Sequence, residues 1–114
     1  MEDCIFCKIA AGQIKSELLY QDDKVVAFND IHPMTPVHIL IIPREHIASL
    51  TDIKEKHEVL MGHMVYVANK LARENLIDRD GYRVVINVGE HGTQIIKHVH
   101  LHLLGGRQLA PGMV

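Results

Sequence analysis

The sequence contains no hydrophobic run long enough to cross a lipid bilayer. Its longest apolar stretches, such as Ile39–Ile42 and Val84–Ile86, fall far short of the roughly 20 residues that a membrane-spanning helix needs. The first residues, Met1-Glu2-Asp3, do not resemble a secretory leader. We therefore expect a cytoplasmic protein with no membrane partner.

An excess of positive charge is also missing. The 12 Lys and Arg residues stand against 14 Asp and Glu residues, which gives a formal net charge of −2. A protein that binds duplex nucleic acid is expected to carry a basic surface, so no nucleic-acid partner is expected, and any nucleotide ligand should be small. With 114 residues, the chain has room for one domain, predicted to span 1–114.

Cysteine is scarce, because Cys4 and Cys7 are the only two. Without an export signal, a structural disulfide is the less favoured interpretation of this CxxC motif. A thioredoxin-like redox role is less favoured too, because it expects a βαβ pattern that the chain lacks. CxxC is half of a four-coordinate zinc site, and His46 and His98 are candidates for the other half. An inert or buried pair of thiols remains the alternative.

Repeats and low-complexity segments are absent, and the hydrophobic pattern predicts an α+β domain. Leu60, Met64, Val67 and Leu71 recur at the spacing of one helix face. Helices are predicted at 5–11 and 52–75, and strands at 17–20, 25–28, 37–42, 83–88 and 98–104. Because these elements do not alternate as βαβ units, we expect an antiparallel sheet with helices packed on it.

Histidine is abundant, with nine residues. His98, His100 and His102 alternate with apolar residues, so on a strand the three imidazoles share one face at intervals of roughly 6.6 Å. A solvent-facing polar edge and a catalytic zinc held by two of the three are alternatives. We favour nucleophilic or acid-base chemistry on an anionic substrate, because histidine titrates near neutral pH and forms covalent intermediates.

The middle histidine, His100, is the candidate nucleophile. A neutral imidazole attacks phosphorus through one nitrogen if the other donates its proton to a fixed acceptor. Flanking imidazoles then donate hydrogen bonds to the phosphoryl oxygens. His38 would face the same site if its strand neighbours the last one; otherwise it is a hydrogen-bonded core residue. Segment 87–94 could bind phosphate through backbone amides and polar side chains, or be an ordinary connection between strands.

These residues match a known family. HVHLHLL at 98–104 fits the histidine triad signature, His-φ-His-φ-His-φ-φ with φ apolar. CIFCKI, FND, TPVHILIIPREHI, GYRVVINVG and HVHLHLLGGRQ resemble, in order, segments of the Hint branch, and the CxxC motif resembles its zinc-binding bacterial type. The resemblance implies the HIT fold, with a five-stranded antiparallel sheet, one long and one short helix, and a homodimer.

The resemblance also implies an activity. Hint proteins hydrolyse or transfer at the α-phosphate of purine nucleoside phosphoramidates or aminoacyl adenylates, through a nucleotidyl-histidine, and release NMP. His100 matches the nucleophile, His102 the histidine that contacts the α-phosphate, and His38 a further active-site histidine. The nucleotide contacts match Ile5, Phe6, Phe28, Asn29, Asp30, Ile31, Asn87, Thr93, Gln94, His100 and His102. The zinc ligands match Cys4, Cys7, His46 and His98, with zinc in a structural role and no catalytic metal required.

Two positions depart from the family pattern. Ile95 stands where Ser or Thr commonly follows the Gln, and Thr93 stands where Gly is usual. The first change removes a possible hydroxyl donor to the phosphate or leaving group. The alternatives to a Hint enzyme are a dinucleoside polyphosphate hydrolase of the Fhit type, a non-catalytic nucleotide-binding regulator, and a plain zinc-binding module.

Overall fold

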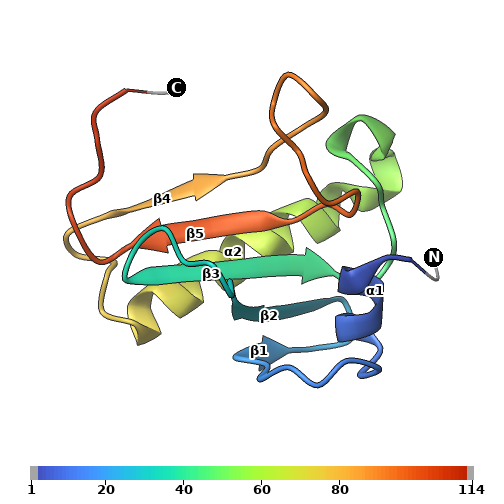
Figure 1. Ribbon diagram of the computed structural model, residues 1–114, viewed down its shortest axis with the longest axis horizontal. Helices are drawn as coiled ribbons and strands as arrows, with labels where there is room; N and C mark the ends of the chain where they lie inside the picture. Colours follow the sequence, from blue (N-terminus) through green and yellow to red (C-terminus); the bar gives the residue numbers. More distant parts are fainter. Residues whose placement is uncertain (1–2, 113–114) are drawn as a thin grey trace.

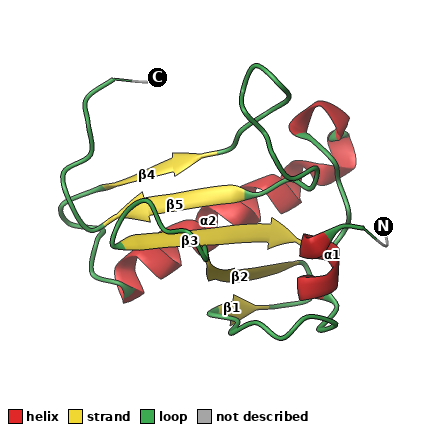
Figure 2. Ribbon diagram, viewed as in Figure 1, coloured by secondary structure: helices red, strands yellow, loops and turns green. Residues whose placement is uncertain are grey.

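The computed structural model describes residues 3–112, which form one five-stranded sheet with a helix on each face (Figures 1 and 2). All neighbouring strands pair antiparallel, in the order β1-β2-β3-β5-β4. The elements are α1 (Ile5–Ala10), β1 (Tyr20–Gln21), β2 (Val25–Asn29), β3 (Val37–Pro43), α2 (Glu58–Glu74), β4 (Tyr82–Val85) and β5 (Leu101–Gly105). The predicted α+β class and antiparallel sheet are confirmed. No helix within residues 3–112 meets the length and hydropathy that a membrane span requires.

The two faces of the sheet are buried separately, because alternate residues of a strand point to opposite faces. Ile39, Ile41 and Leu103 lie in the core beneath α2. Leu40 and Ile42 lie on the other face, in a smaller core that includes α1 residues Phe6, Ile9 and Ala10. This explains why 37–42 is almost continuously apolar: β3 is central and covered on both faces.

The long helix buries the stripe that its sequence predicts. Met64, Val67, Ala68, Leu71 and Ala72 face the sheet. The helix begins at 58 rather than at the predicted 52, because two short 3-10 turns, Leu50–Asp52 and Glu55–His57, precede it. In the second turn the ring Nδ1 of His57 accepts the main-chain N–H of Lys54 over 2.9 Å, which holds the tighter geometry.

Several strand ends differ from prediction by one residue, and three differ by three residues. The first strand covers 20–21 instead of 17–20, the fourth ends at Val85 instead of Val88, and the fifth begins at Leu101 instead of His98. At the last of these, the main-chain N–H of Val99 donates to Ile47 O over 2.7 Å, in the loop after β3. His98 therefore lies in a bent approach to β5, outside the strand ladder. This displacement matters for the site.

Candidate active site and metal-binding cluster

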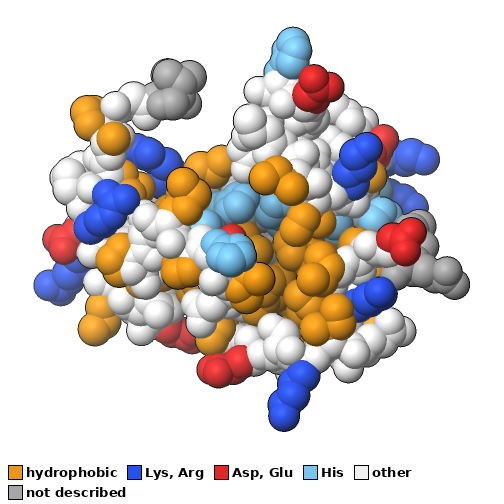
Figure 3. All heavy atoms as spheres, viewed as in Figure 1, with side chains coloured by type: hydrophobic (Ala, Val, Ile, Leu, Met, Phe, Trp, Pro, Cys, Tyr) orange, Lys and Arg blue, Asp and Glu red, His pale blue; other side chains and the backbone are white. Residues whose placement is uncertain are grey.

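Three histidines meet in a groove on the α1 face of the sheet. His38 comes from β3 and His102 from β5, and these two strands are neighbours, as the candidate site requires. The ring centroids of His38 and His102 lie 5.2 Å apart, and those of His100 and His102 lie 4.9 Å apart. Figure 3 shows the histidine side chains along a hollow in the surface, flanked by hydrophobic side chains. The first histidine of the triad, His98, belongs to a different cluster, described below.

The backbone fixes the tautomer of His100. Its ring Nδ1 lies 2.7 Å from the main-chain carbonyl oxygen of His98. A carbonyl oxygen only accepts hydrogen bonds, so Nδ1 carries the proton and donates it. In the neutral ring, Nε2 then holds a free lone pair. His100 is buried, and its edge-to-face contact with Phe6, at 5.1 Å between ring centroids, restrains the ring.

A second chain of hydrogen bonds fixes His38 and His102. The main-chain N–H of Met34 donates to Nδ1 of His38 over 3.1 Å. His38 must therefore be protonated on Nε2, which lies 2.9 Å from Nδ1 of His102 and donates to it. The proton of neutral His102 is then on Nε2. His100 and His102 thus have opposite tautomers: one offers a lone pair from Nε2, and the other offers an N–H.

Burial keeps both histidines of this chain neutral. It lowers the pKa of His38, against the attraction of the Asp30 carboxylate. It also lowers the pKa of His102 to about 4, and the charges that His100 and His38 carry when protonated lower it further. At neutral pH, His102 is therefore a neutral hydrogen-bond donor rather than a cation.

Asp30 completes this group, since its Oδ2 lies 3.4 Å from Nε2 of His38. Asp30, His38 and His102 have ligand atoms close enough together for one metal ion. The hydrogen bonds oppose that use. If Nε2 of neutral His38 bound a metal, Nδ1 would carry the proton and would point at the N–H of Met34, donor against donor. The arrangement suits proton and hydrogen-bond chemistry better than metal binding.

A separate cluster fits a metal ion well. Cys4, Cys7, His46 and His98 each offer one ligand atom, and these atoms all lie within 4.8 Å of one another. Nδ1 of His46 lies 3.1 Å from Cys7 Sγ, and Nδ1 of His98 lies 3.3 Å from Cys4 Sγ. His98 donates its Nε2–H to Pro43 O over 2.8 Å, so its Nδ1 lone pair faces the sulfur atoms. Two thiolates and two neutral imidazoles, with one imidazole anchored by a carbonyl, are a typical zinc donor set.

The pKa of Cys7 bears on the charge that a metal ion would meet in this cluster. Burial, together with the hydrogen bond and the charge of Cys4, raises the pKa of Cys7 to about 11. At neutral pH the two sulfur atoms are therefore not both deprotonated, unless a cation lies between them. Cys4 is also the N-cap of α1, where its Sγ accepts the N–H of Cys7 over 3.3 Å. The short helix thus carries two of the four candidate ligands.

The residues predicted to line a nucleoside pocket differ in burial, and only two of them form a buried apolar wall. Phe6 and Phe28 are buried, in edge contact at 5.6 Å between ring centroids. Ile5 and Ile31 are exposed, Ile31 to 85%. Asn29 ends β2, and its exposed side chain precedes Asp30.

The predicted phosphate loop is held by its own polar side chains. The Asn87 amide donates to Gly92 O over 2.8 Å, and the Gln94 amide donates to Ala48 O over 2.7 Å. The Thr93 hydroxyl donates to Gly92 O. Thr93 adopts a φ of 60°, in the left-handed region that favours glycine. Ile95 is 88% exposed. In this conformation, Asn87 and Gln94 shape the loop through hydrogen bonds within the protein.

Three important groups of the site belong to the main chain. They are the N–H of Met34 and the carbonyls of Pro43 and His98. Sequence patterns carry no signal for such groups, because every residue other than proline has the same N–H and C=O. Two prolines of the loop, Pro33 and Pro36, indicate a rigid turn but do not show which amide meets a ring.

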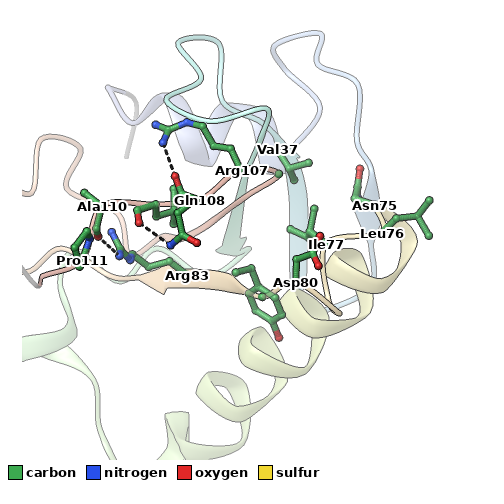
Figure 4. Close-up of a pocket in the computed structure, with 14 residues that line it drawn as sticks. Val37, Asn75, Leu76, Ile77, Asp80, Arg83, Arg107, Gln108, Ala110 and Pro111 are labelled. Carbon is green, nitrogen blue, oxygen red and sulfur yellow. Dashed lines mark hydrogen bonds between the residues drawn. The ribbon is translucent and has the colours of Figure 1, made fainter.

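A cavity of about 830 Å³ lies away from the histidines, between the end of α2, the start of β4 and the C-terminal segment 106–111. Figure 4 shows Arg83 and Arg107 beside it. Their guanidinium groups donate to main-chain carbonyls of that same segment, Ala110 O at 2.8 Å and Gln108 O at 3.0 Å. These arginines hold the tail in place, and none of the predicted site residues lines this cavity.

Comparisons with known proteins show which family this chain resembles. Residues 3–113 match a family model described as scavenger mRNA decapping enzyme C-term binding. The chain is 48% identical over 110 residues to a protein of Escherichia coli strain K12 named purine nucleoside phosphoramidase, covering 96% of this chain and 92% of that protein. It is 47% identical over 107 residues to a protein of Zea mays named 14 kDa zinc-binding protein, covering 92% and 83%.

A solved structure shares the fold over nearly its full length. The crystal structure of a HIT family hydrolase from Legionella pneumophila superimposes with a TM-score of 0.93 at 43% identity, covering 96% of this chain and 97% of that one.

Proposed function

Because the chain belongs to the histidine triad family, we propose that this hydrolase acts at the α-phosphate of purine nucleoside phosphoramidates or aminoacyl adenylates and releases NMP. The observation that carries the proposal is the hydrogen bond from Nδ1 of His100 to His98 O. It leaves Nε2 of His100 as a buried, neutral nucleophile beside the N–H of His102. The relative named purine nucleoside phosphoramidase supports the substrate class.

In the first step, Nε2 of His100 attacks the α-phosphorus, a P–N bond to the ring forms, and the bond to the leaving amine or acyl group breaks. His102 donates a hydrogen bond from Nε2 to the phosphate as charge develops, and a departing amine takes its proton from solvent water. His38 supports His102 in this role, because its Nε2–H donates to Nδ1 of His102.

In the second step, water attacks the phosphorus and loses a proton to solvent, the P–N bond breaks, and the imidazole leaves. A ring phosphorylated on Nε2 and protonated on Nδ1 carries a positive charge, which the carbonyl oxygen of His98 stabilises. When the P–N bond breaks, the ring departs as the same neutral tautomer that attacked. His100 therefore needs no change of proton between the two steps, and no catalytic metal takes part.

The nucleotide is proposed to lie along the groove from α1 to the loop at 87–94. The apolar side chains of Ile5, Phe6, Phe28 and Ile31 hold the base, and the Asp30 carboxylate accepts from the ribose hydroxyls. Asp30 Oδ1 already accepts the N–H of His32 over 2.8 Å, which orients the group. Asn29, Asn87, Thr93 and Gln94 supply further polar contacts.

Zinc is proposed to bind Cys4, Cys7, His46 and His98 in a structural role. When bound, the ion supplies positive charge that stabilises the thiolates and links three segments of the chain. Cys4 and Cys7 would thereby tie α1 to the turn after β3 and to the approach to β5. The relative named zinc-binding protein supports this assignment.

A homodimer is proposed as the working form. Strand β4 is at an edge of the sheet, where Val84 is exposed. The outward face of α2 exposes the apolar side chains of Val59, Val65 and Tyr66. Exposed apolar patches of this kind are typical of protein–protein interfaces. Light scattering coupled to size-exclusion chromatography measures the mass directly.

A small purine nucleotide is the proposed ligand, and no nucleic-acid or membrane partner is proposed. The proposed location of the protein is the cytoplasm.

The test is a side-by-side assay of adenosine 5′-phosphoramidate and diadenosine tetraphosphate, with His100→Ala as the control. We expect release of AMP from the phosphoramidate by the wild-type protein and none by the variant, with fold and metal content unchanged. Preference for the dinucleotide would assign the protein to the Fhit type. Binding of AMP without turnover of either compound would favour a non-catalytic regulator, and wild-type rates in His100→Ala would exclude the mechanism.

A further inference from the structure

One residue joins the metal-binding cluster to the proposed nucleophile. The ring of His98 directs Nδ1 at the sulfur atoms of Cys4 and Cys7, 3.3 and 3.5 Å away. The main-chain carbonyl of His98 accepts the Nδ1–H of His100 over 2.7 Å. We propose that zinc in the cluster positions His100 for attack, by fixing the carbonyl that sets its tautomer. This rests on the proposed function, which places zinc in the cluster and assigns His100 as the nucleophile.

The carbonyl of His98 lies outside the strand ladder, because β5 begins only at Leu101. One hydrogen bond, from the N–H of Val99 to Ile47 O over 2.7 Å, holds the peptide that follows His98, and Ile47 directly follows the candidate ligand His46. The His98 ring is fully buried, and its Nε2–H donates to Pro43 O. With Nδ1 bound to a metal, the ring would be held at both nitrogens. Without the metal, contacts between Nδ1 and sulfur replace a coordinate bond, and these are weak hydrogen bonds.

Phe6 provides a second connection between the cluster and the nucleophile. It lies on α1 between the two cysteines, and its ring makes edge contacts with His98 at 5.9 Å and with His100 at 5.1 Å between centroids. Helix α1 has six residues, too few to be stable alone. The C-terminal end is held by Arg44, which donates to Ala10 O over 2.7 Å. The N-terminal end is held by the cysteines, so metal loss would loosen the end that carries Phe6.

The expected consequence is a loss of orientation at His100 while the hydrogen-bond chain of His102 stays intact. His102 takes its tautomer from Met34 through His38, and neither of these hydrogen bonds involves a residue of the cluster. Removal of zinc should therefore lower kcat by about 10- to 100-fold, the usual effect of misplacing a reacting group by about an ångström. The KM for the nucleotide should rise by a smaller factor, because Phe6 of the proposed apolar wall lies at the loosened end of α1 while Asp30 and Phe28 do not.

The experiment compares zinc-loaded, chelator-treated and zinc-reconstituted protein labelled with ¹⁵N-histidine. Long-range ¹H–¹⁵N spectra report the tautomer of each ring, so the primary measurement does not depend on activity. We expect His100 to show one tautomer with zinc, a mixture of tautomers after treatment with dipicolinate, and recovery when Zn²⁺ is added back. His102 is the internal control, and its tautomer should not change. Unchanged His100 signals and unchanged kcat after complete zinc removal would overturn the inference.

A pair of variants tests the coupling without removing the metal. In zinc-loaded protein, Phe6→Leu deletes the ring contact with His100, while Phe28→Leu deletes an aromatic ring that contacts Phe6. The first should broaden or shift the His100 ring signals, and the second should leave them unchanged. Equal effects, or no effect of Phe6→Leu, would refute this part of the inference. The pair also keeps the inference testable if the zinc-free protein unfolds.

Failure of the inference and failure of the proposed function are distinguishable. If the zinc-loaded protein releases no AMP from the phosphoramidate, the proposed function fails, and the tautomer spectra still decide whether zinc controls His100. If the loaded protein is active and the zinc-free protein keeps the same kcat and the same spectra, the function stands and the coupling is wrong.

Discussion

The main-chain N–H of Met34 donates to Nδ1 of His38, and this single bond decides the protonation of two rings. It requires the proton of His38 to be on Nε2, where it is donated to Nδ1 of His102. His102 must then carry its own proton on Nε2. A loop outside the sheet thus supplies the direction of the hydrogen-bond chain, and β3 and β5 supply the spacing.

Replacing His38 tests this chain, and two substitutions form a matched pair. His38→Leu removes both the acceptor for Met34 and the donor to His102. We expect kcat to fall by about 100-fold, within the usual range for loss of one hydrogen-bond donor to the reacting phosphate, and stability to fall by about 1–3 kcal/mol, because the Met34 N–H and Nδ1 of His102 lose their partners. His38→Gln offers an oxygen to Met34 and an N–H to His102, and should recover part of both losses.

The measurements for this pair are steady-state kinetics on the phosphoramidate and the ¹⁵N spectrum of His102. A purely structural role for His38 predicts lower stability in the Leu variant with the tautomer of His102 unchanged. Equal kcat in the Leu and Gln variants would also contradict the chain.

The low pKa of His102 predicts how stability depends on pH. Burial, helped by the charges of protonated His100 and His38, lowers this pKa from 6.5 to about 4. Between these values the unfolded chain binds a proton that the folded protein does not, so stability rises with pH. The contribution of His102 is complete above about pH 6.5 and is lost progressively as the pH falls toward 4. Urea unfolding at pH 7, 6, 5 and 4.5 should show this decline, and His102→Asn should make it shallower. An NMR titration in which His102 titrates near pH 6.5 would exclude the explanation.

The sequence predicted which residues come together better than where the strands begin and end. Alternation in HVHLHLL placed Val99, Leu101 and Leu103 on the face opposite the imidazoles, and in the structure they lie in the core beneath α2. It wrongly extended the strand to His98, because periodicity does not show that Val99 bonds to the loop at Ile47 instead of to β3. The CxxC motif likewise predicted two ligands, and the fold brings His46 and His98 to them. The roles of Met34 and Pro43 were beyond prediction, because their main-chain groups come into place only through the fold.

The Asp22 carboxylate, far from the groove, is expected to stabilise the fold in a pH-dependent way. Its carboxylate accepts from His63 Nε2 at 2.6 Å and from the Tyr20 hydroxyl at 2.8 Å, which ties the turn between β1 and β2 to α2. Burial raises the pKa of Asp22, but these hydrogen bonds and those from the N–H groups of Val25 and Lys24 outweigh it and hold the pKa well below its usual range. The stabilisation is therefore present above about pH 4 and lost as the pH falls below it.

Asp22→Asn should lower the free energy of unfolding by about 1–3 kcal/mol at pH 7, because an amide nitrogen would face two donors. Denaturant unfolding measures the change. The matched control is Lys70→Ala, which removes the exposed pair between Lys70 and Glu74 and should cost less than about 0.5 kcal/mol. Similar losses in the two variants would show that Asp22 is an ordinary surface charge.

The last prediction concerns Ile95, where the chain departs from the family pattern. The side chain is 88% exposed, so Ile95→Ser should change stability by less than about 0.5 kcal/mol. If a hydroxyl at this position donates to the phosphate or the leaving group, the variant should turn over adenosine phosphoramidate faster. One hydrogen bond to a charged group, about 1.5 kcal/mol, corresponds to roughly tenfold in kcat. Ile95→Val is the control that keeps the site apolar and should leave kcat unchanged. An equal rate in Ile95→Ser and the wild-type protein would show that the loop conformation, in which Gln94 is turned inward to Ala48 O, keeps position 95 away from the reacting phosphate.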